Sequence, residues 1–383
     1  MKLNGQIFNG SKLKYLTDLK VIFCIYLVIT VAISLHKYSI GRIHNFEIFR
    51  QSFSNLIDQG DIYVRYPKLW LDYYKYSPAF ALLIAPISIL PKYLGVIAWN
   101  LVNTIPLFFA VSKLDFESKK KAFILWIIFV ELVTSIQNCQ SNGIYTALFV
   151  FTFILLENKR SFWAALIVAL LVYIKIFGGI AAILFIFYPG RFKFLLYLTF
   201  WFAVLALFPL LVVSPDQLLF LYERWYNLLT RDALTLYGLS VMGVVKTWFG
   251  LNISNLLSIL GGLVLLALPL LRISKYNNSD FRRLFLSSLL IWTVIFNHKA
   301  ESPMFVIAVT GVAIWYVLQK STLISKSLLW FTLVVTSLSS TDIFPAVIRD
   351  GIIQPYLLKA IPCIVVWIAI ERQLLTSSTA EGL

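Results

Sequence analysis

The residues best suited to chemistry lie in short polar stretches between apolar ones. The stretch NHKAESP places His298, Lys299 and Glu301 in one tight turn between two apolar segments. A connecting turn needs only small polar residues, so two titratable groups and an ammonium exceed what the chain path requires. His298 is therefore a candidate for moving a proton, and Glu301 is a candidate ligand for a sugar or an acceptor.

A lysine interrupts the apolar run LLVYIKIFGGIAAILF. An ionisable group inside a bilayer costs about 2.5–3.5 kcal/mol on insertion scales, so Lys175 needs a partner or a task. Gly178 and Gly179 follow it and permit a close approach, and its ammonium suits a lipid phosphate or pyrophosphate. Glu131 also stands in an apolar run, and a polar contact between helices is favoured for it over a role in the site.

Amide and aromatic side chains occupy two other turns. In QNCQSNG, Gln140 and Asn142 suit the hydroxyl groups of a sugar, although turn and capping roles explain these amides equally well. In YYKYSP, Lys75 and Tyr76 stand against an oily run that prolines interrupt. Lys75 can reach a phosphate or extend to water, and the tyrosines suit a lipid headgroup layer.

Acidic and aromatic residues mix in HNFEIFRQSFSNLIDQGDIYVRYP. Glu47, Asp58 and Asp61 there, with the neighbouring rings, could hold a sugar by hydrogen bonds and stacking. A solvated amphipathic hairpin is the alternative interpretation. Arg231, in a later amphipathic stretch, could contact a donor phosphate, but lipid headgroups are the slightly favoured partner.

These stretches must be positioned by membrane-spanning helices. The chain has 383 residues, of which 60% are hydrophobic and 13% are charged, and its mean hydropathy is +0.82. Charged residues make up about a quarter of an ordinary soluble domain, so a soluble class is excluded. Apolar stretches long enough for a ~30 Å hydrocarbon core recur from end to end. The sequence predicts one all-α polytopic membrane domain over residues 1–383.

Several function classes lack their usual signals. The sequence has no P-loop, no GxGxxG before a helix and no His and Asp cluster with metal-ligand spacing. Its three cysteines show no CxxC spacing and are interpreted as packing residues. The net charge of +15 comes from short Lys and Arg clusters between apolar runs, which indicates topology in preference to nucleic-acid binding. No cofactor, metal or nucleic-acid partner is expected.

The basic clusters also predict the topology. If all of them are cytoplasmic, the chain makes about twelve crossings with both termini inside, and residues 373–383 form a short cytoplasmic tail. The two large external loops then cover about residues 36–92 and 214–254. Residues 161–188 are the least regular part, because two crossings must share them and would be short helices meeting at Lys175. Residues 77–91 need not cross, because the next segment can do so alone.

A family resemblance joins these stretches. GDIYVRYP, YYKYSPAFALLIAPISILP and WNLVN, followed by IQNCQSN and IKIFGG, resemble the bacterial membrane glycosyltransferases of family 87, which depend on polyprenyl-phosphate-mannose. The resemblance implies a GT-C fold whose two external loops carry amphipathic helices. It implies that a hexose passes, with inversion, from a polyprenyl-phosphate donor to a lipid or glycan acceptor. The site would lie on the periplasmic or external face of a bacterial plasma membrane.

The chain departs from the family pattern at one important position. The family places a catalytic Asp after the first span, where this chain has Asn45. Glu47 is then the first candidate for the general base, with Asp58, Asp61, Glu301 and His298 as alternatives, and Asn45 is left as a sugar or acceptor ligand. Two residues along a helix turn a side chain by about 200°, whereas in an extended segment they face the same way. Lys175, Arg231 and Lys75 are the expected donor-phosphate ligands, and Tyr76 is an expected sugar or acceptor ligand.

Two other functions remain open. A secondary transporter or a flippase of lipid-linked intermediates would carry its polar groups toward the midplane of the bilayer, whereas here they gather at predicted external ends. An inactive subunit of an envelope-polysaccharide assembly complex is compatible with the amide at Asn45.

Overall fold

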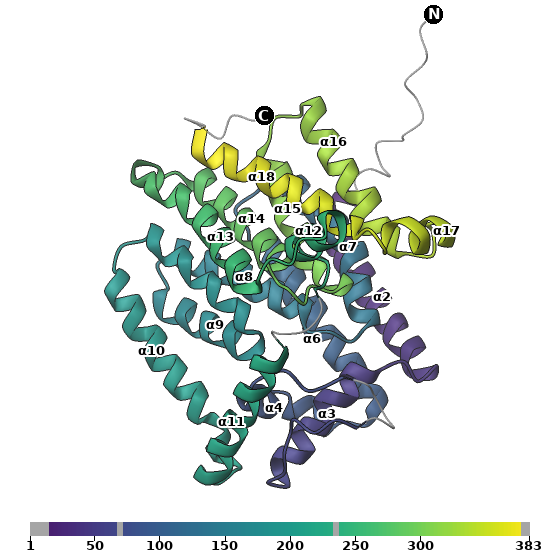
Figure 1. The fold of residues 1–383 in the computed structure, drawn as a ribbon, viewed down its shortest axis with the longest axis vertical. Helices are drawn as coiled ribbons and strands as arrows, with labels where there is room; N and C mark the ends of the chain where they lie inside the picture. The colour runs from purple at the N-terminus through teal and green to yellow at the C-terminus, as the bar shows by residue number, and fades with distance from the viewer. Residues whose placement is uncertain (1–14, 67–71, 233–236, 377–383) are drawn as a thin grey trace, which may run out of the picture.

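The computed structural model describes residues 15–66, 72–232 and 237–376, and every regular element in them is a helix (Figure 1). The first half contains α2 Leu19–Ser39, α3 His44–Ile57, α4 Pro78–Leu83, α5 Ala85–Ser88, α6 Lys92–Ser112, α7 Ser118–Gln137, α8 Asn142–Glu157, α9 Ser161–Ile174 and the 3-10 helix η1 Ile176–Phe187. The second half contains α10 Arg191–Leu207, η2 Phe208–Leu211, α11 Pro215–Asp232, α12 Val241–Phe249, α13 Asn255–Ala267, η3 Leu268–Leu271, η4 Ile273–Lys275, α14 Ser279–Ile295, η5 Ser302–Met304, α15 Phe305–Leu318, α16 Leu323–Phe331, η6 Thr332–Ser337, η7 Leu338–Ser340, α17 Ala346–Ile348, η8 Arg349–Ile353, η9 Leu358–Ala360 and α18 Ile361–Thr376.

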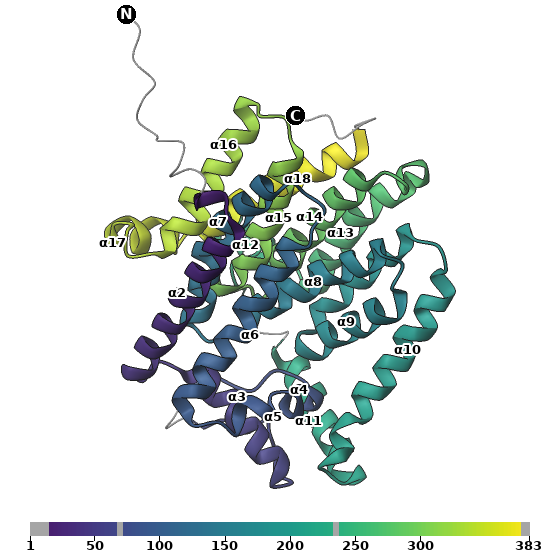
Figure 2. The ribbon, with the colours of Figure 1, turned by 180° about the vertical axis from the view of Figure 1, so that it is seen from behind.

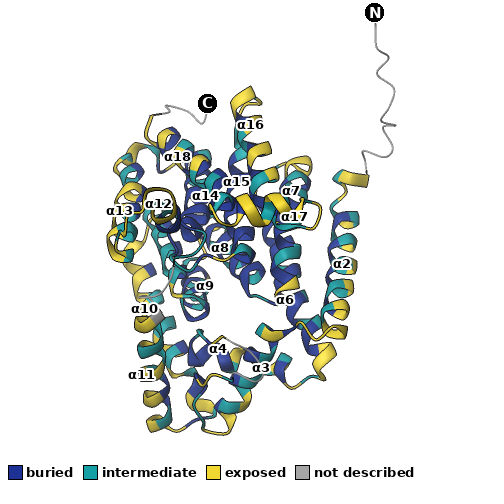
Figure 3. Ribbon diagram, turned by 45° about the vertical axis from the view of Figure 1, so that its right-hand side comes forward, coloured by how far each residue is buried: buried dark blue, intermediate teal, exposed yellow. Residues whose placement is uncertain are grey.

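The centre of the molecule is a helical bundle around α14 and α15. Nearly all side chains of α15 are buried, and α14 is buried from Leu284 to Ile295 (Figure 3). A helix that is apolar on all sides needs partners on all sides, and these two pack against each other and against α7, α8 and α18. The main hydrophobic core runs from Ile22 on α2 to Leu374 on α18.

The periphery of the bundle exposes large apolar side chains. On α10, Phe192, Leu196, Phe200 and Leu207 are at least half exposed. Four helices, counted with the short helical turns that continue them, are long and apolar enough to cross a membrane. A fifth candidate is the bent pair Ala346–Ile353 and Leu358–Thr376, whose two parts meet at 86°, if it is counted as one span. A water-soluble protein rarely exposes such continuous apolar faces, so the chain is an integral membrane protein of helical type. The number of about twelve crossings stays a prediction.

The region around Lys175 consists of short helices. Helix α9 has 14 residues and η1 has 12, which gives lengths of about 21 Å and 24 Å, both below a ~30 Å core. They meet at Lys175, whose extended backbone separates them. At the other end of the chain, α18 continues through Thr376, so it occupies the start of the expected tail at 373–383. The rest of that tail lies outside the described residues.

Helices α3, α4, α5 and α11 gather at one end of the bundle (Figures 1 and 2). Helix α3 is amphipathic and buries Phe46, Phe49 and Leu56 while its other face is polar. The oily segment after YYKYSP does not cross: Ser77 caps α4, Pro78 begins it, and α4 and α5 have only six and four residues. This segment therefore covers one end of the bundle without spanning it.

Candidate active site

Four predicted site residues form one hydrogen-bonded chain. Lys175 Nζ donates to Asn142 Oδ1 at 2.6 Å, and Asn142 Nδ2 donates to Gln140 Oε1 at 2.7 Å. Gln140 Nε2 in turn donates to Glu301 Oε2 at 2.7 Å. We call Lys175, Asn142, Gln140 and Glu301 the amide chain. It links an ammonium to a carboxylate through two amides and joins three separate parts of the sequence.

The turn that carries Gln140 is fixed from two neighbouring helices. Cys139 has a left-handed backbone (φ 49°), and its carbonyl accepts from Trp99 Nε1 on α6 at 2.8 Å. Asn45 Nδ2 on α3 donates to the Asn138 carbonyl at 2.7 Å. Asn45 therefore lies against the QNCQSNG turn and holds it through an amide.

Helices α6 and α8 approach closely beside this turn. Asn103 Oδ1 on α6 accepts from Ile144 N at 3.1 Å. A Cβ atom on Gly143 would lie 2.5 Å from the Asn103 carbonyl oxygen, so only glycine permits this approach. The WNLVN and QNCQSNG stretches therefore pack together and place Asn142 within hydrogen-bond distance of Lys175.

A second set of contacts positions Lys175. Ser77 Oγ donates to the Tyr173 carbonyl at 2.7 Å, which ties the YYKYSP stretch to the end of α9. Gly178 N donates to the Lys175 carbonyl at 2.8 Å, and a Cβ on Gly178 would lie 2.7 Å from the Leu171 carbonyl oxygen. Gly178 therefore allows the chain to fold back on α9 just after Lys175.

The electrostatic setting of Lys175 suits an anionic ligand. Lys175 lies in the connection between α9 and η1, and burial lowers the pKa of its ammonium to about 8, with Glu301 opposing and Lys75 adding to the shift. The group is therefore still mostly protonated at pH 7. Lys75 Nζ lies 3.0 Å from Asp72 Oδ1, so this second cation is near Lys175 with a carboxylate beside it.

Tyr76 and His298 border the amide chain. The Tyr76 hydroxyl lies 2.9 Å from Ser141 Oγ, and its ring stacks on Phe80 with a centroid distance of 4.8 Å. Burial raises the pKa of Tyr76 well above its usual value, so the hydroxyl stays neutral. The His298 ring lies 6.3 Å from the ring of Phe177, which follows Lys175 by two residues.

Three other predicted site residues, Glu47, Asp61 and Arg231, lie outside the amide chain. Glu47 Oε1 accepts from Lys92 Nζ at 3.0 Å. Because α3 is a helix, the Glu47 side chain points about 200° away from that of Asn45. Asp61 Oδ2 accepts from Arg224 Nε at 2.8 Å, and Arg231 is exposed in the last turn of α11. The structure therefore groups Lys175, Asn142, Gln140 and Glu301, and places Glu47, Asp61 and Arg231 outside this group.

A buried ion pair joins Glu131, which the sequence indicated, to Lys359, which it did not. Glu131 on α7 accepts from Lys359 Nζ at 2.9 Å, and the side chains are 0% and 3% exposed respectively. The interpretation of Glu131 as a contact between helices is confirmed. Lys359 was missed, although a lone lysine in the apolar stretch QPYLLKAIPCIVV was the available signal.

The part of the chain that the structure describes shows no set of side chains arranged as metal ligands. In the ranges 15–66, 72–232 and 237–376, no group of three or more His, Cys, Asp or Glu side chains is placed to hold a metal ion. The side chains of the amide chain can instead bind a phosphate through an ammonium and sugar hydroxyls through amides.

A comparison with protein families accounts for the same stretches. No curated protein matches the chain. The family model for glycosyltransferase family 87 matches residues 74–296, which is more than half of the sequence. The match begins inside YYKYSP and includes Gln140, Asn142 and Lys175, and it ends just before NHKAESP. This integral membrane protein therefore belongs to glycosyltransferase family 87.

Proposed function

We propose that this glycosyltransferase moves a mannose-like hexose from a polyprenyl-phosphate donor to a hydroxyl of a lipid or glycan acceptor, with inversion. The observation that carries the proposal is the amide chain, in which a partly buried ammonium is joined through sugar-compatible amides to a carboxylate. A lipid-linked donor fits a protein whose site residues are carried by membrane helices and which shows no nucleotide-binding motif.

Lys175 would bind the donor phosphate. An ammonium has three N–H donors, of which one goes to Asn142, so the others can reach phosphate oxygens. Positive charge beside a leaving phosphate stabilises the negative charge that develops on it. Lys75 adds to this field, and Tyr76 offers an aromatic face next to the same site.

Glu301 has the strongest geometric support as the general base. The acceptor oxygen would attack the anomeric carbon opposite the phosphate, and the phosphate would leave with the electron pair of the broken C–O bond. The acceptor proton would pass to a carboxylate. Glu301 is exposed and belongs to the amide chain, whereas Glu47 and Asp61 each face a cation. His298, three residues before Glu301, is the alternative proton carrier.

The proposed orientation follows from the basic clusters. About twelve spans in a bacterial plasma membrane, with both termini cytoplasmic, place the amide chain at the external end. Helices α3 and α11 then belong to the two large external loops, where an amphipathic helix can lie in the interface.

The test is sugar transfer by the purified protein in lipid, with radiolabelled polyprenyl-phosphate hexoses and a panel of alkyl glycosides as acceptors. A charged hydrogen bond contributes about 1.5–3 kcal/mol, so Lys175→Ala should lower transfer about ten- to hundredfold. Lys193→Ala removes an exposed lysine from α10, near the predicted cytoplasmic surface, and should leave transfer unchanged.

The assay also separates the rival functions. Unchanged transfer in Lys175→Ala would remove Lys175 from the site. Movement of the intact lipid-linked sugar across proteoliposomes, with no covalent product, would support a flippase. Absence of both activities across the donor panel would contradict the glycosyltransferase proposal and favour an inactive subunit.

A further inference from the structure

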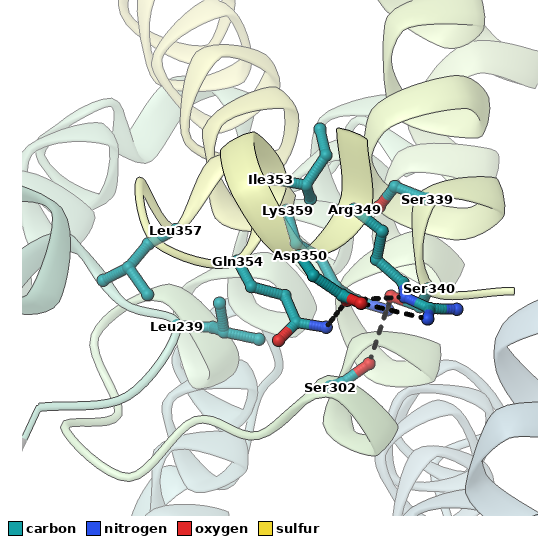
Figure 4. A pocket seen from close by; sticks show the side chains of 10 residues that line it. All are labelled: Leu239, Ser302, Ser339, Ser340, Arg349, Asp350, Ile353, Gln354, Leu357 and Lys359. Carbon is teal, nitrogen blue, oxygen red and sulfur yellow. Dashed lines mark hydrogen bonds and ion pairs between the residues drawn. The ribbon is translucent and has the colours of Figure 1, made fainter. Parts of the chain in front are cut away.

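A cavity with both polar and apolar walls lies beside the NHKAESP segment, which contributes Ser302 to it. Its volume is about 580 Å³, within the range of ~300–1,000 Å³ that is usual for small-molecule sites. Figure 4 shows its walls, which come from the segment after α17, from η7, from η5 and from the stretch before α12. The lining residues are Leu239, Ser302, Ser339, Ser340, Arg349, Asp350, Ile353, Gln354, Leu357 and Lys359.

The NHKAESP segment contributes neighbouring residues to the amide chain and to this cavity. Glu301 has an extended backbone (φ −108°, ψ 159°) and is followed directly by Ser302, the first residue of η5. The Glu301 carboxylate accepts from Gln140 of the amide chain. Ser302 lines the cavity and donates to Ser340 Oγ at 3.3 Å.

The NHKAESP segment is held in place by the residues before α12. Gly238 N donates to the His298 carbonyl at 2.6 Å, and Leu239 N donates to the Ala300 carbonyl at 2.8 Å. A Cβ on Gly238 would lie 2.3 Å from the Ala300 carbonyl oxygen, so these two segments of the chain are in direct contact. This part of the cavity wall is therefore held by backbone hydrogen bonds, and Glu301 lies next to it in the chain.

The charges around the cavity are balanced. Lys359 lies at its base and pairs with Glu131 at 2.9 Å, and it also donates to Ser340 Oγ at 3.0 Å. Arg349 pairs with Asp350 at 2.8 Å and with Asp342 at 3.3 Å. An anionic ligand would have to compete with these carboxylates for the two cations.

The remaining polar groups suit hydroxyls. Ser302 and Ser340 each carry an O–H that can donate and accept. Gln354 Nε2 donates to Asp350 at 3.1 Å, and its carbonyl oxygen is also an acceptor that a ligand hydroxyl can use. The apolar side chains of Leu239, Ile353 and Leu357 supply surface against which the carbon face of a sugar ring can pack.

We infer that this cavity is the acceptor subsite and that it binds a neutral, hydroxyl-bearing headgroup, such as the terminal sugar of a glycolipid. The inference rests on the proposed function, because it needs a donor bound near Lys175. It places the acceptor beside Glu301, because Glu301 directly precedes Ser302 of the cavity wall and also contacts Gln140 of the amide chain. Most cavity residues, from Ser302 onward, lie beyond the matched family segment of 74–296.

The first test is equilibrium binding of a neutral alkyl glycoside to the purified protein without donor. Each lost hydrogen bond removes about 1 kcal/mol, so Gln354→Ala and Ser302→Ala should each weaken binding by about fivefold. Val347→Ala changes a side chain on α17 that is 85% exposed, just before the cavity residues of η8, and this variant should bind the glycoside as the wild type does. Lys175→Ala should also bind the glycoside normally.

The second test is kinetic. In sugar transfer, Gln354→Ala should raise the KM for the alkyl glycoside by about fivefold, while donor affinity, measured with the polyprenyl-phosphate hexose alone, stays within the error of wild type. Thermal unfolding in detergent identifies a variant that is merely misfolded, and Gln354→Glu, of similar size, provides a second substitution at the same position.

The two ideas can fail separately. If the wild type transfers sugar but the glycoside KM and binding are unchanged in both cavity variants, the acceptor subsite is wrong and the glycosyltransferase proposal stands. If phosphatidylglycerol vesicles displace the glycoside and neutral phosphatidylcholine vesicles do not, the cavity binds anions and the inference is overturned. If the wild type lacks donor turnover and glycoside binding, both proposals fall.

Discussion

Lys175 combines a partly buried position with a hydrogen bond to the Asn142 amide. The sequence identified it because an ammonium in an apolar run is costly. Gln140 and Asn142, which share one turn, were chosen as amides that suit sugar hydroxyls, and Glu301 was chosen as a titratable group in a turn that does not need one. Their assembly into one chain could not be predicted, because Gln140 and Glu301 are 161 positions apart and only the tertiary packing brings them together.

The protonation of Lys175 should set the upper pH limit of donor binding. Burial lowers the pKa of this ammonium from 10.5 to about 8, so its positive charge is present below that pH and is lost as the pH rises through it. Donor affinity should therefore fall above pH 8, which binding of a polyprenyl-phosphate hexose analogue between pH 6 and pH 10 would measure. Lys175→Arg keeps the charge at higher pH and should shift the decline upward. An identical pH profile in both proteins would contradict the assignment.

Lys359 marks the limit of reasoning from single residues. Lys359 stands at the start of an apolar stretch, where a cation is expected anyway, either as a charge that sets the orientation of the span or as a side chain that extends to water. Its true partner, Glu131, is 228 positions away. Glu131 could be interpreted as a contact between helices, but nothing in the sequence identified the residue that it contacts.

Short helices shape the site. The prolines in YYKYSPAFALLIAPISILP indicated a segment that does not cross, and α4 and α5 have this form. The short pair around Lys175 was also anticipated. What local sequence did not indicate is that η1 is a 3-10 helix or that the chain before α18 bends by 86°. Both depend on packing against the bundle, which overrides local preference.

The close approach of α6 and α8 should be essential for the amide chain. In Gly143→Ala the new methyl group would lie 2.5 Å from the Asn103 carbonyl oxygen, so α8 must move. Overpacking of this kind costs about 1–3 kcal/mol, and it should also weaken donor binding by displacing Asn142. Thermal unfolding in detergent and donor binding measure the two effects.

A matched control exists on α13. A Cβ on Gly261 has no heavy atom within 4 Å, so Gly261→Ala should unfold at the wild-type temperature or slightly above it. If Gly143→Ala is as stable and as active as Gly261→Ala, the contact between α6 and α8 does not position the site.

At the scale of the whole molecule, the site, the cavity and the amphipathic helices should all face the outside of the cell. The physical basis is the charge bias, because Lys and Arg clusters near the ends of spans stay on the cytoplasmic side. Single cysteines can test this in a cysteine-free parent in which Cys24, Cys139 and Cys363 are replaced by serine. Asp58→Cys, after α3, and Asp216→Cys, on α11, should react in intact cells with a maleimide that cannot cross membranes. Lys120→Cys and Lys159→Cys should react only after permeabilisation, and the opposite pattern would invert the topology and place the amide chain and the cavity on the cytoplasmic side.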